Sequence, residues 1–207
     1  MAYKVLIVDD QNMSRQLFES FVRDSENYEL VYALDSASEA DAYPARYHID
    51  LIIMDVVMKN GISGLDAAER IRKNYPQIRI IAVTSMPESA FIRRAREIGI
   101  DSFWYKEVAQ ETLLSVMDRT MAGEHVYPDE APVVQLGLCQ SSELTEREID
   151  VLRVLAAGCS DEEIAEKLNI SIHTVRTHII HMRDKTGYKS RMELALNALR
   201  SGVVVPE

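Results

Sequence analysis

Short apolar runs alternate with stretches of helical spacing through the first 122 residues. In the helical stretches, apolar residues recur three or four positions apart, as at Phe91, Ala95 and Ile98 before the breaker Gly99. The apolar runs are YKVLIV from Tyr3, YELVYAL from Tyr28, DLIIM from Asp50, IRIIAV from Ile78 and DSFWY from Asp101. This alternation predicts an α/β domain built on a doubly wound, five-stranded parallel sheet with helices on both faces.

The pattern changes after residue 122. The segment 123–143, GEHVYPDEAPVVQLGLCQSSE, contains two prolines and two glycines and keeps no sustained period, so it predicts a linker. Helical spacing returns in residues 146–157, 161–168, 172–186 and 191–201. We therefore expect a first domain over residues 1–122, a linker over 123–143 and a small all-α, four-helix domain over 144–207.

Composition narrows the class of protein further. The 207 residues are 47% hydrophobic and 27% charged, which excludes a disordered or fibrous chain. No apolar run approaches the roughly 18 residues of a membrane span, so we expect a cytoplasmic protein that does not enter a membrane. The two cysteines, Cys139 and Cys159, form no CxxC pair, so neither a zinc site nor a disulfide framework is indicated.

The net charge of -10 argues against a nucleic-acid partner until its distribution is considered. Residues 1–143 carry 14 Lys and Arg against 23 Asp and Glu, whereas residues 144–207 carry 9 against 10. Within the second part, residues 171–191 contain five basic side chains and one acid, Asp184. The C-terminal domain therefore has a basic stretch where a phosphate backbone could bind.

Polar and charged residues follow four of the predicted strands. They are Asp9 and Asp10 after the first, Asp55 after the third, Thr84 after the fourth and Lys106 after the fifth. The carboxyl ends of parallel strands meet at one edge of a sheet, so these side chains should lie together. Three carboxylates at about 4 Å repel by about 4 kcal/mol per pair. Mg²⁺, which prefers oxygen ligands, and Lys106 could supply the counter-charge.

Such a site suits phosphoryl transfer to an aspartate. A carboxylate is a competent nucleophile toward a phosphoryl group, and Asp55 would be the acceptor. Asp10 would bind the metal directly and Asp9 through water, while Thr84 and Lys106 would contact the phosphoryl oxygens. Taken one at a time, these residues have simpler interpretations as helix caps, turn acids, strand residues or surface charges. Their joint occurrence at the strand ends favours the site.

The motifs VLIVDD, LIIMD, VTS and FWYK, at these spacings, resemble the receiver domain of two-component response regulators over residues 3–122. The resemblance implies a flavodoxin-like fold with sheet order 2-1-3-4-5 and five helices. It further implies a set of roles: Asp9 and Asp10 as the acid pair, Asp55 as phosphoacceptor, the backbone carbonyl of Val57 as a metal ligand, Thr84 as the switch hydroxyl, Phe103 as the switch aromatic and Lys106 as the lysine of the site.

The loop after Asp55 departs from that family pattern. Lys59 stands where the family usually has proline, and Gly64 lies nine rather than eight residues after Asp55, so MKNGISG has one extra residue. Moreover, Val57 and Met86, two positions after Asp55 and Thr84, are apolar. Because such side chains do not orient an attacking water, we expect a long-lived acyl phosphate, with at most slow autodephosphorylation.

The pattern of the C-terminal part predicts a helix, a tight turn and a second helix. Thr145 and Glu148 form a capping-box signature before the first helix. In residues 172–186, the spacing of Val175, Ile179 and Met182 turns these side chains toward the core. The candidate DNA contacts are Thr174, Arg176, Thr177, Ile180 and Arg183 on the outward face and Lys185 and Lys189 for phosphates. A merely solvated helix face would explain the charges alone about as well.

Residues 144–195, with LTEREIDVL, EIAEKLNIS, TVRTH and KTGYKSRMEL, resemble the LuxR-type helix-turn-helix. With the receiver, this likeness points to the NarL/FixJ class of DNA-binding transcription regulators. It implies that Met192, Leu196 and Leu199 of the last helix support dimerisation on DNA. The alternative, which does not exclude dimerisation, is that these three side chains close the core of the small domain.

The expected function is transcription regulation switched by Mg²⁺-dependent phosphorylation of Asp55. The expected partners are a sensor histidine kinase, double-stranded promoter DNA and a second copy of the chain in the active state. One alternative is a DNA-binding regulator that works without phosphorylation and uses its receiver for dimerisation. A second is an aspartyl-phosphate phosphatase, but such enzymes usually carry an acid where this chain has Val57. We therefore expect no enzyme beyond the phosphoryl acceptor.

Overall fold

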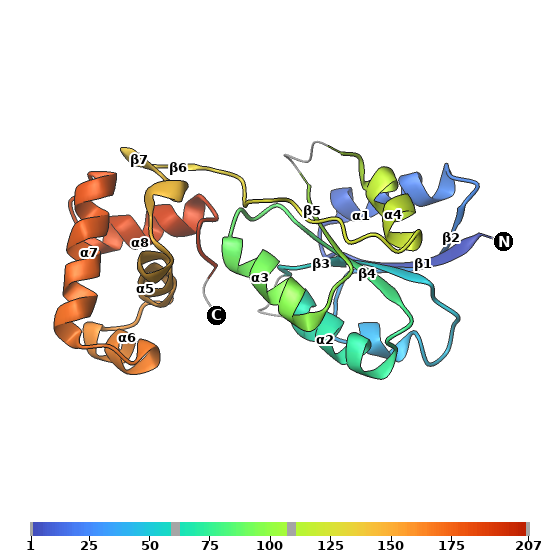
Figure 1. The fold of residues 1–207 in the computed structure, drawn as a ribbon, viewed down its shortest axis with the longest axis horizontal. Coiled ribbons are helices and arrows are strands. Elements are labelled where there is room, and N and C mark those ends of the chain that lie inside the picture. Colours follow the sequence, from blue (N-terminus) through green and yellow to red (C-terminus); the bar gives the residue numbers. More distant parts are fainter. Residues whose placement is uncertain (1, 59–62, 107–110, 206–207) are drawn as a thin grey trace. The chain divides into compact units, whose positions relative to one another are not determined.

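The computed structural model describes residues 2–58, 63–106 and 111–205. The chain divides into two compact units, which are treated separately below (Figure 1). The N-terminal unit comprises residues 1–85 and 89–130, and the C-terminal unit comprises Met86–Glu88 and residues 131–207. The division between Glu130 and Ala131 falls inside the segment 123–143, where the sequence loses its period.

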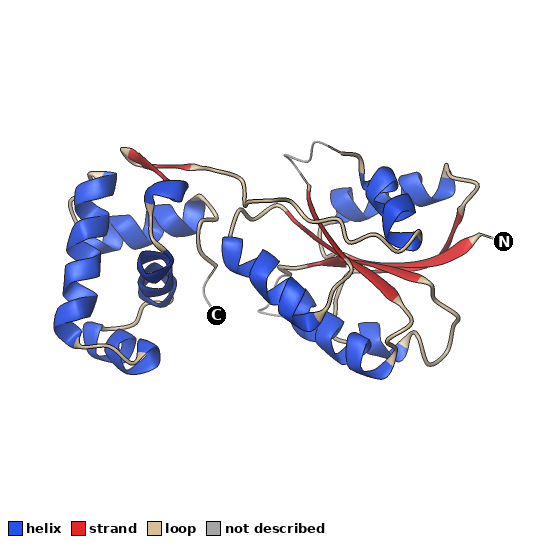
Figure 2. Cartoon of the chain, viewed as in Figure 1, coloured by secondary structure: helices blue, strands red, loops and turns tan. Residues whose placement is uncertain are grey.

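The N-terminal unit is built on one parallel sheet. Its strands are β1 (Tyr3–Val8), β2 (Tyr28–Leu34), β3 (Leu51–Asp55), β4 (Arg79–Thr84) and β5 (Ser102–Tyr105), in the order β2-β1-β3-β4-β5 (Figure 2). All five predicted strands and the predicted order are confirmed. Every residue of β3 is buried, as expected for a continuously apolar strand covered on both faces.

Two helices cover each face of this sheet. α1 (Asn12–Arg23) and α4 (Leu113–Met121) lie on one face, and α2 (Gly64–Asn74) and α3 (Ser89–Ile98) lie on the other (Figure 1). Phe18 and Val22 of α1 pack with Val116 and Met117 of α4 in a single buried cluster. These contacts pack α1 and α4 together on this face of the sheet.

The connection between β2 and β3 differs from the five-helix pattern that the resemblance implies. Among the described residues, this connection contains a short 3-10 turn, η1 (Ala40–Ala42), and no α-helix. Pro44 lacks the backbone N–H that a helix needs, and the Ser36 hydroxyl accepts a hydrogen bond from the Ser38 amide. Tyr43 stacks here between Tyr32 and Tyr47, with ring centroids 5.1 and 6.0 Å away.

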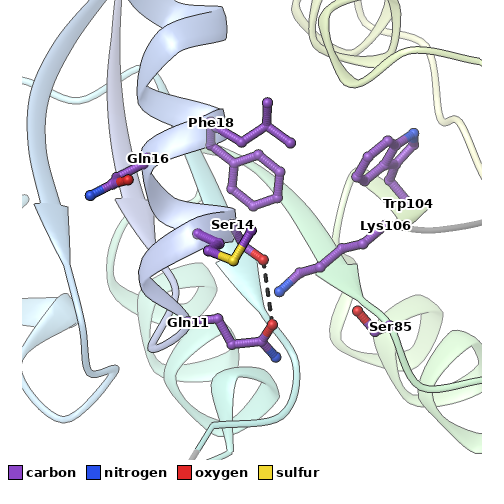
Figure 3. Close-up of a pocket in the computed structure, with 9 residues that line it drawn as sticks. Gln11, Ser14, Gln16, Phe18, Ser85, Trp104 and Lys106 are labelled. Atoms are coloured by element: carbon purple, nitrogen blue, oxygen red, sulfur yellow. Dashed lines mark hydrogen bonds between the residues drawn. The ribbon is translucent and has the colours of Figure 1, made fainter.

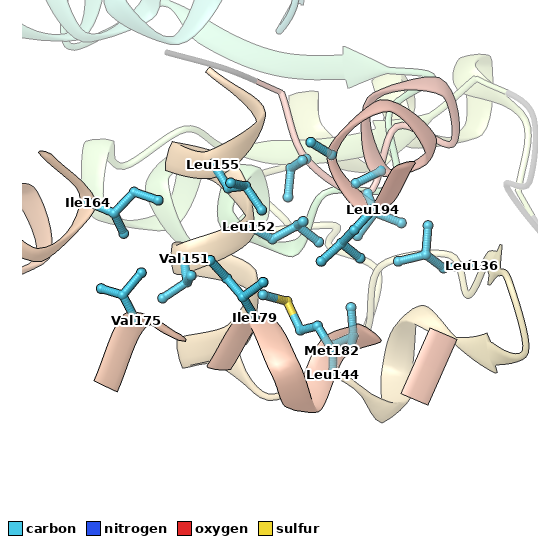
Figure 4. Close-up of a cluster of buried hydrophobic side chains, with 14 of the residues drawn as sticks. Leu136, Leu144, Val151, Leu152, Leu155, Ile164, Val175, Ile179, Met182 and Leu194 are labelled. Carbon is cyan, nitrogen blue, oxygen red and sulfur yellow. The ribbon is translucent and has the colours of Figure 1, made fainter. Parts of the chain in front are cut away.

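The C-terminal unit is helical, as predicted. Its helices are α5 (Glu146–Ala156), α6 (Asp161–Leu168), α7 (Ile172–Thr186) and α8 (Arg191–Arg200). Val175, Ile179 and Met182 of α7 are buried against Val151 and Leu152 of α5, which confirms the predicted inward face (Figure 4). Two short strands, β6 (Gln135–Leu136) and β7 (Cys139–Gln140), and the 3-10 turn η3 (Ser141–Glu143) precede α5. Sequence periodicity did not indicate that hairpin, because each strand has two residues.

Gly64 is the residue that lets α2 begin against the end of β3. Its amide donates a hydrogen bond to the Val56 carbonyl at 3.0 Å. A Cβ at position 64 would lie 1.7 Å from the carbonyl oxygen of Asp55. Because that contact is to backbone, the backbone of Asp55 or of α2 would have to move to accept any side chain.

We predict that Gly64→Ala lowers the free energy of unfolding by about 3 kcal/mol or more, because the overlap forces a backbone shift. Gly99→Ala is the matched control, since its Cβ meets nothing within 4 Å and only its φ of +79° is strained. That control should lose about 1 to 2 kcal/mol. Urea unfolding of both variants measures the difference, and equal losses would contradict the steric explanation.

Candidate functional site

The three candidate acids meet at the carboxyl edge of the sheet. β1 and β3 are neighbours with Val8 opposite Met54, so Asp9 and Asp55 leave the sheet side by side. One carboxylate oxygen from each of Asp9, Asp10 and Asp55 lies within 4.8 Å of the others. Asp9 and Asp55 are buried, and Asp10 is partly exposed.

Lys106 brings a single positive charge into this cluster. Its Nζ lies 2.7 Å from Asp9 Oδ2 and 3.2 Å from Asp55 Oδ2, and its side chain is 7% exposed. The Lys106 amide also donates to the Thr84 carbonyl, which continues the β4–β5 ladder and fixes where the lysine leaves the sheet. The backbone amide of Gln11 donates to the other Asp9 oxygen at 2.8 Å. Each carboxylate oxygen of Asp9 therefore has a donor within 2.8 Å.

The negative charge of Asp55 is less well balanced by neighbouring positive charge. Burial is the largest influence and raises the pKa of the Asp55 carboxyl to about 7, with Lys106 opposing the shift and Asp9 adding to it. An ionised Asp55 thus needs more positive charge than Lys106 supplies. Three carboxylate oxygens at this spacing form the hard donor set that suits a divalent cation such as Mg²⁺.

The loop next to the acids is described in part. Val57, whose carbonyl is a candidate metal ligand, forms a bridge with Ser63 just before α2. The Ser63 hydroxyl caps α2 by accepting from the Asp66 amide. Lys59 and the rest of residues 59–62, where the sequence has its extra position, lie outside the described residues.

The two candidate switch residues lie on the neighbouring strands. Thr84 ends β4, one residue after Val83, which pairs with Asp55. Thr84 is 1% exposed and faces Tyr105 across the β4–β5 ladder. Phe103 of β5 is also 1% exposed, and its ring lies edge-on to the Tyr105 ring at 5.3 Å. The structure therefore places both switch candidates in the core, with Thr84 on the strand next to the acceptor strand β3 and Phe103 one strand further out.

A pocket of about 560 Å³ opens beside the acids, between α1 and the ends of β4 and β5. Figure 3 shows Lys106 extending toward Gln11 and Ser14 at the start of α1, with Trp104 and Phe18 beyond it. Met13 and Leu17 of α1 line the same pocket and are 85% and 48% exposed. The pocket thus joins Lys106 to an apolar patch on the surface of α1.

The second candidate site is the outward face of α7. A tight turn separates α6 from α7, and Asn169 takes the left-handed conformation there, with φ of 51°. Arg176 and Ile180 are exposed on α7, and Thr174 and Thr177 are partly exposed. Lys189, just after the helix, is also exposed. These side chains form one surface that a nucleic-acid groove could meet.

Asp161 was not predicted as part of this face. Its carboxylate nevertheless forms ion pairs with Arg176 on α7 and with Arg191 at the start of α8. Its carboxylate lies 2.9 Å from Arg176 Nε and 2.7 Å from Arg191 Nη1. From sequence, Asp161 reads as an ordinary acid in the first turn of α6. Its partners are 15 and 30 residues away, so only the folded arrangement reveals the pairing.

Two further candidates are bound within the small domain. Lys185 Nζ lies 2.7 and 3.0 Å from the two oxygens of Glu148 and 3.0 Å from the Glu143 carbonyl. Burial opposes ionisation of Glu148, but hydrogen bonds from Lys185 and Thr145 outweigh burial and lower the pKa of this carboxyl. Arg183 donates to the carbonyls of Tyr188 and Lys189 after α7. These contacts place Lys185 and Arg183 beside the fold's own backbone.

The apolar stripe of α8 does not close the core. Leu194, Ala195 and Ala198 fill that position, and Met192 and Leu196 are 65% and 46% exposed.

Within the described residues, no helix has the length and apolar character needed to cross a bilayer.

Comparison with known proteins identifies both units. Residues 5–118 match the family described as response regulator receiver domain, and residues 142–198 match the luxR family of bacterial regulatory proteins. The response regulator protein VraR of Staphylococcus aureus is 31% identical over 209 residues, which cover 99% of this chain and 100% of VraR. VraR of Staphylococcus epidermidis is 32% identical over 211 residues, with the same two shares.

Solved structures show the same fold. The RcsB–DNA complex has a TM-score of 0.64 and 21% sequence identity, covering 97% of this chain and 99% of RcsB. RcsB from Salmonella enterica serovar Typhimurium, bound to the promoter rprA with BeF₃⁻, has a TM-score of 0.61 and 23% identity, with shares of 96% and 98%. The chain therefore belongs to the two-component response regulators of the NarL/FixJ class, with a receiver domain followed by a LuxR-type DNA-binding domain.

Proposed function

We propose that this response regulator accepts a phosphoryl group on Asp55 in a Mg²⁺-dependent reaction and thereby controls its binding to promoter DNA. The observation that carries the proposal is the cluster of Asp9, Asp10, Asp55 and Lys106 at one edge of the sheet. Asp55 is the acceptor because it ends the central strand β3 and lies beside Lys106, which lines the pocket.

The side chains divide the work of phosphoryl transfer. Asp9, Asp10 and Asp55, with the Val57 carbonyl, hold Mg²⁺, which when bound spreads the negative charge of the transferred group. The Asp55 oxygen attacks phosphorus, and the bond from phosphorus to the donor breaks as the new one forms. Lys106 then contacts the phosphoryl oxygens, and the Thr84 hydroxyl donates to one of them. The Phe103 ring, which is already buried, then turns toward Thr84, and that movement changes the packing at β4 and β5.

The phosphoryl donor is a sensor histidine kinase that approaches over α1. Exposed Met13 and Leu17 provide apolar contact area, and the pocket behind them leads to Lys106. Hydrolysis of the product is slow, because Val57 and Met86 are apolar and do not orient a water. The chain thus acts as a phosphoryl acceptor, and it regulates transcription from the cytoplasm.

The output is DNA binding through α7 by a dimer. Thr174, Thr177 and Ile180 face base edges, while Arg176, Arg183 and Lys189 contact phosphates. Lys185 can add to that positive field, although its contacts with Glu148 give it a structural role as well. Met192 and Leu196 on α8 supply an exposed apolar surface for a second copy. RcsB, which shares the fold, has been solved as dimers on DNA.

To test this function, we propose treating the full chain with Mg²⁺ and acetyl phosphate or BeF₃⁻. Intact mass, oligomer mass and duplex binding are then measured for the wild type and Asp55→Ala. The wild type should gain one phosphoryl group, dimerise and bind DNA more tightly, whereas Asp55→Ala should not respond. Decay of the acyl phosphate within seconds would contradict slow hydrolysis.

Two other outcomes of the same experiment would replace the proposal. A wild type that binds DNA equally with and without the donor would favour a regulator that works independently of phosphorylation. Turnover of a phosphomonoester that is lost in Asp55→Asn would favour a phosphatase. Both results are distinct from simple failure to fold, which circular dichroism would detect.

We predict that metal-free wild-type protein loses stability as the pH rises from about 4 to about 7. The folded pKa of Asp55 is about 7 and the unfolded value is 3.8, so the folded state binds more protons in this range. Asp55→Asn should remove this loss and stabilise the metal-free protein at pH 8 by about 2 to 4 kcal/mol. Unfolding in EDTA measures the effect, with the exposed acid variant Asp24→Asn as control.

The same measurement with Mg²⁺ gives a second readout. Because the cation binds the ionised carboxylates, Mg²⁺ should stabilise the wild type more at pH 8 than at pH 6. If Mg²⁺ stabilised Asp55→Asn as much as it stabilises the wild type at both pH values, Asp55 would not be part of the cation site.

We further predict that Asp161→Asn tightens binding to a mixed-sequence duplex at low salt by about 2- to 5-fold, because it frees Arg176 and Arg191 from a competing carboxylate. Arg176→Ala should reduce the slope of log affinity against log salt concentration by about 1, the value for one lost phosphate contact. Asp184→Asn makes the same change of charge on α7 and should have a smaller effect. An equal gain in both Asn variants would rule out a specific role for Asp161.

A further inference from the structure

The chain just after α4 is docked on the free edge of β5. β5 is the last strand of the sheet, so one side of its backbone has no neighbouring strand. Residues 125–127, which we call the docked segment, cover that side. Its hydrogen bonds run from Phe103 N to Val126 O (2.8 Å), Val126 N to Ser102 Oγ (3.1 Å), Tyr127 OH to Ile100 O (2.8 Å) and His125 Nδ1 to Asp101 O (2.9 Å).

Tyr127 connects this segment to the switch aromatic. The Tyr127 ring stacks on the Phe103 ring, with centroids 6.3 Å apart and planes 26° apart. On α3, the Arg96 guanidinium carbon lies 4.9 Å from the centroid of the same tyrosine ring. The Phe103 amide also donates a hydrogen bond to the Val126 carbonyl. Both the ring and the backbone of Phe103 therefore contact the docked segment.

The surroundings allow the docked segment to leave. A pocket of about 420 Å³, lined by Arg96, Gly99, Ile100, His125 and Tyr127, flanks it. Val126 is a partly buried side chain at the margin of the core cluster. Release of these three residues would break the hydrogen bonds given above, the stack on Phe103 and the contact with Arg96, without unfolding any strand or helix.

The position of the segment in the chain gives its docking a consequence. Pro128, which fixes its own backbone, follows at once, and the C-terminal unit begins at Ala131. A change at residues 125–127 is thus three residues from the start of the DNA-binding unit. Residues 125–127 thus combine contact with Phe103 and covalent proximity to residues 131–207, which contain the helices of the DNA-binding unit.

We propose that the docked segment is the output element of the receiver, and that it is released when the Phe103 ring turns toward Thr84. The inference rests on the proposed phosphorylation of Asp55, which supplies that turn. When the ring moves toward Thr84, it separates from the Tyr127 ring. The hydrogen bond from the Phe103 amide to the Val126 carbonyl then weakens. The linker then starts at Gly123 rather than at Pro128, which lengthens the flexible connection to the DNA-binding unit.

The test is amide hydrogen exchange on the full chain with and without Mg²⁺ and BeF₃⁻. Exchange of the Phe103 and Val126 amides should accelerate by roughly 3- to 10-fold on BeF₃⁻ binding, the scale set by loss of one aromatic stack. The Asp50 amide, which donates to the Lys4 carbonyl between β1 and β3, should not change. Trp104, the single tryptophan, lines the pocket beside Lys106 and reports BeF₃⁻ binding by fluorescence.

Matched variants separate the stack from the hydrogen bond of Tyr127. Tyr127→Ala should exchange fast at Phe103 and Val126 without BeF₃⁻ and show no further acceleration, while its Trp104 titration stays as in the wild type. Tyr127→Phe keeps the ring and loses the bond to Ile100, so it should keep the response. Full acceleration by BeF₃⁻ in Tyr127→Ala would overturn the inference.

Failure of the inference and failure of the proposed function give different results. If Trp104 reports saturation with BeF₃⁻ and the two amides do not respond in the wild type, the docked segment is not the output element. If BeF₃⁻ does not bind, the proposed function fails, and Phe103→Leu still tests the coupling. That variant should accelerate exchange at Val126 without any ligand, and unchanged exchange there would overturn the coupling itself.

Discussion

A buried carboxylate that one lysine does not fully compensate is the constraint on which the receiver depends. Asp55 is 2% exposed at the end of β3, where burial raises its pKa to about 7 despite Lys106 at 3.2 Å. A folded chain tolerates that carboxylate because β3 is wholly buried and cannot be released locally. In the proposed function, a bound divalent cation meets this remaining demand for positive charge.

The same constraint is transmitted across the sheet by backbone pairing. Val83 pairs with Asp55, Thr84 faces Tyr105, and Lys106 returns to the acid cluster from the end of β5. β4 and β5 therefore both connect to the residues around Asp55. Phe103 lies on β5 with Tyr127 stacked against it, so in our proposal a change at Asp55 reaches the outer edge of the sheet through packed residues.

In the C-terminal unit, acids set how much of the basic charge is available. The unit is nearly neutral in total, and Asp161 and Glu148 each hold basic side chains that sequence alone would assign to the surface. A phosphate backbone has to compete with Asp161 for Arg176 and Arg191. Any phosphate that binds these two arginines therefore has to displace an existing ion pair.

The sequence by itself determined the strands, the starts of the C-terminal helices and the edge at which Asp9, Asp10, Asp55 and Lys106 meet. Those features follow from local periodicity and capping and from the rule that parallel strands end at one edge, whereas the order of the strands was implied by the resemblance to receiver domains. The tertiary structure decided the short turn in place of a second helix, the raised pKa of Asp55, the pairing of Asp161 with Arg176 and Arg191, and the docking of residues 125–127 on β5. These depend on burial and on contacts between residues distant in the chain, which no local pattern of residues encodes.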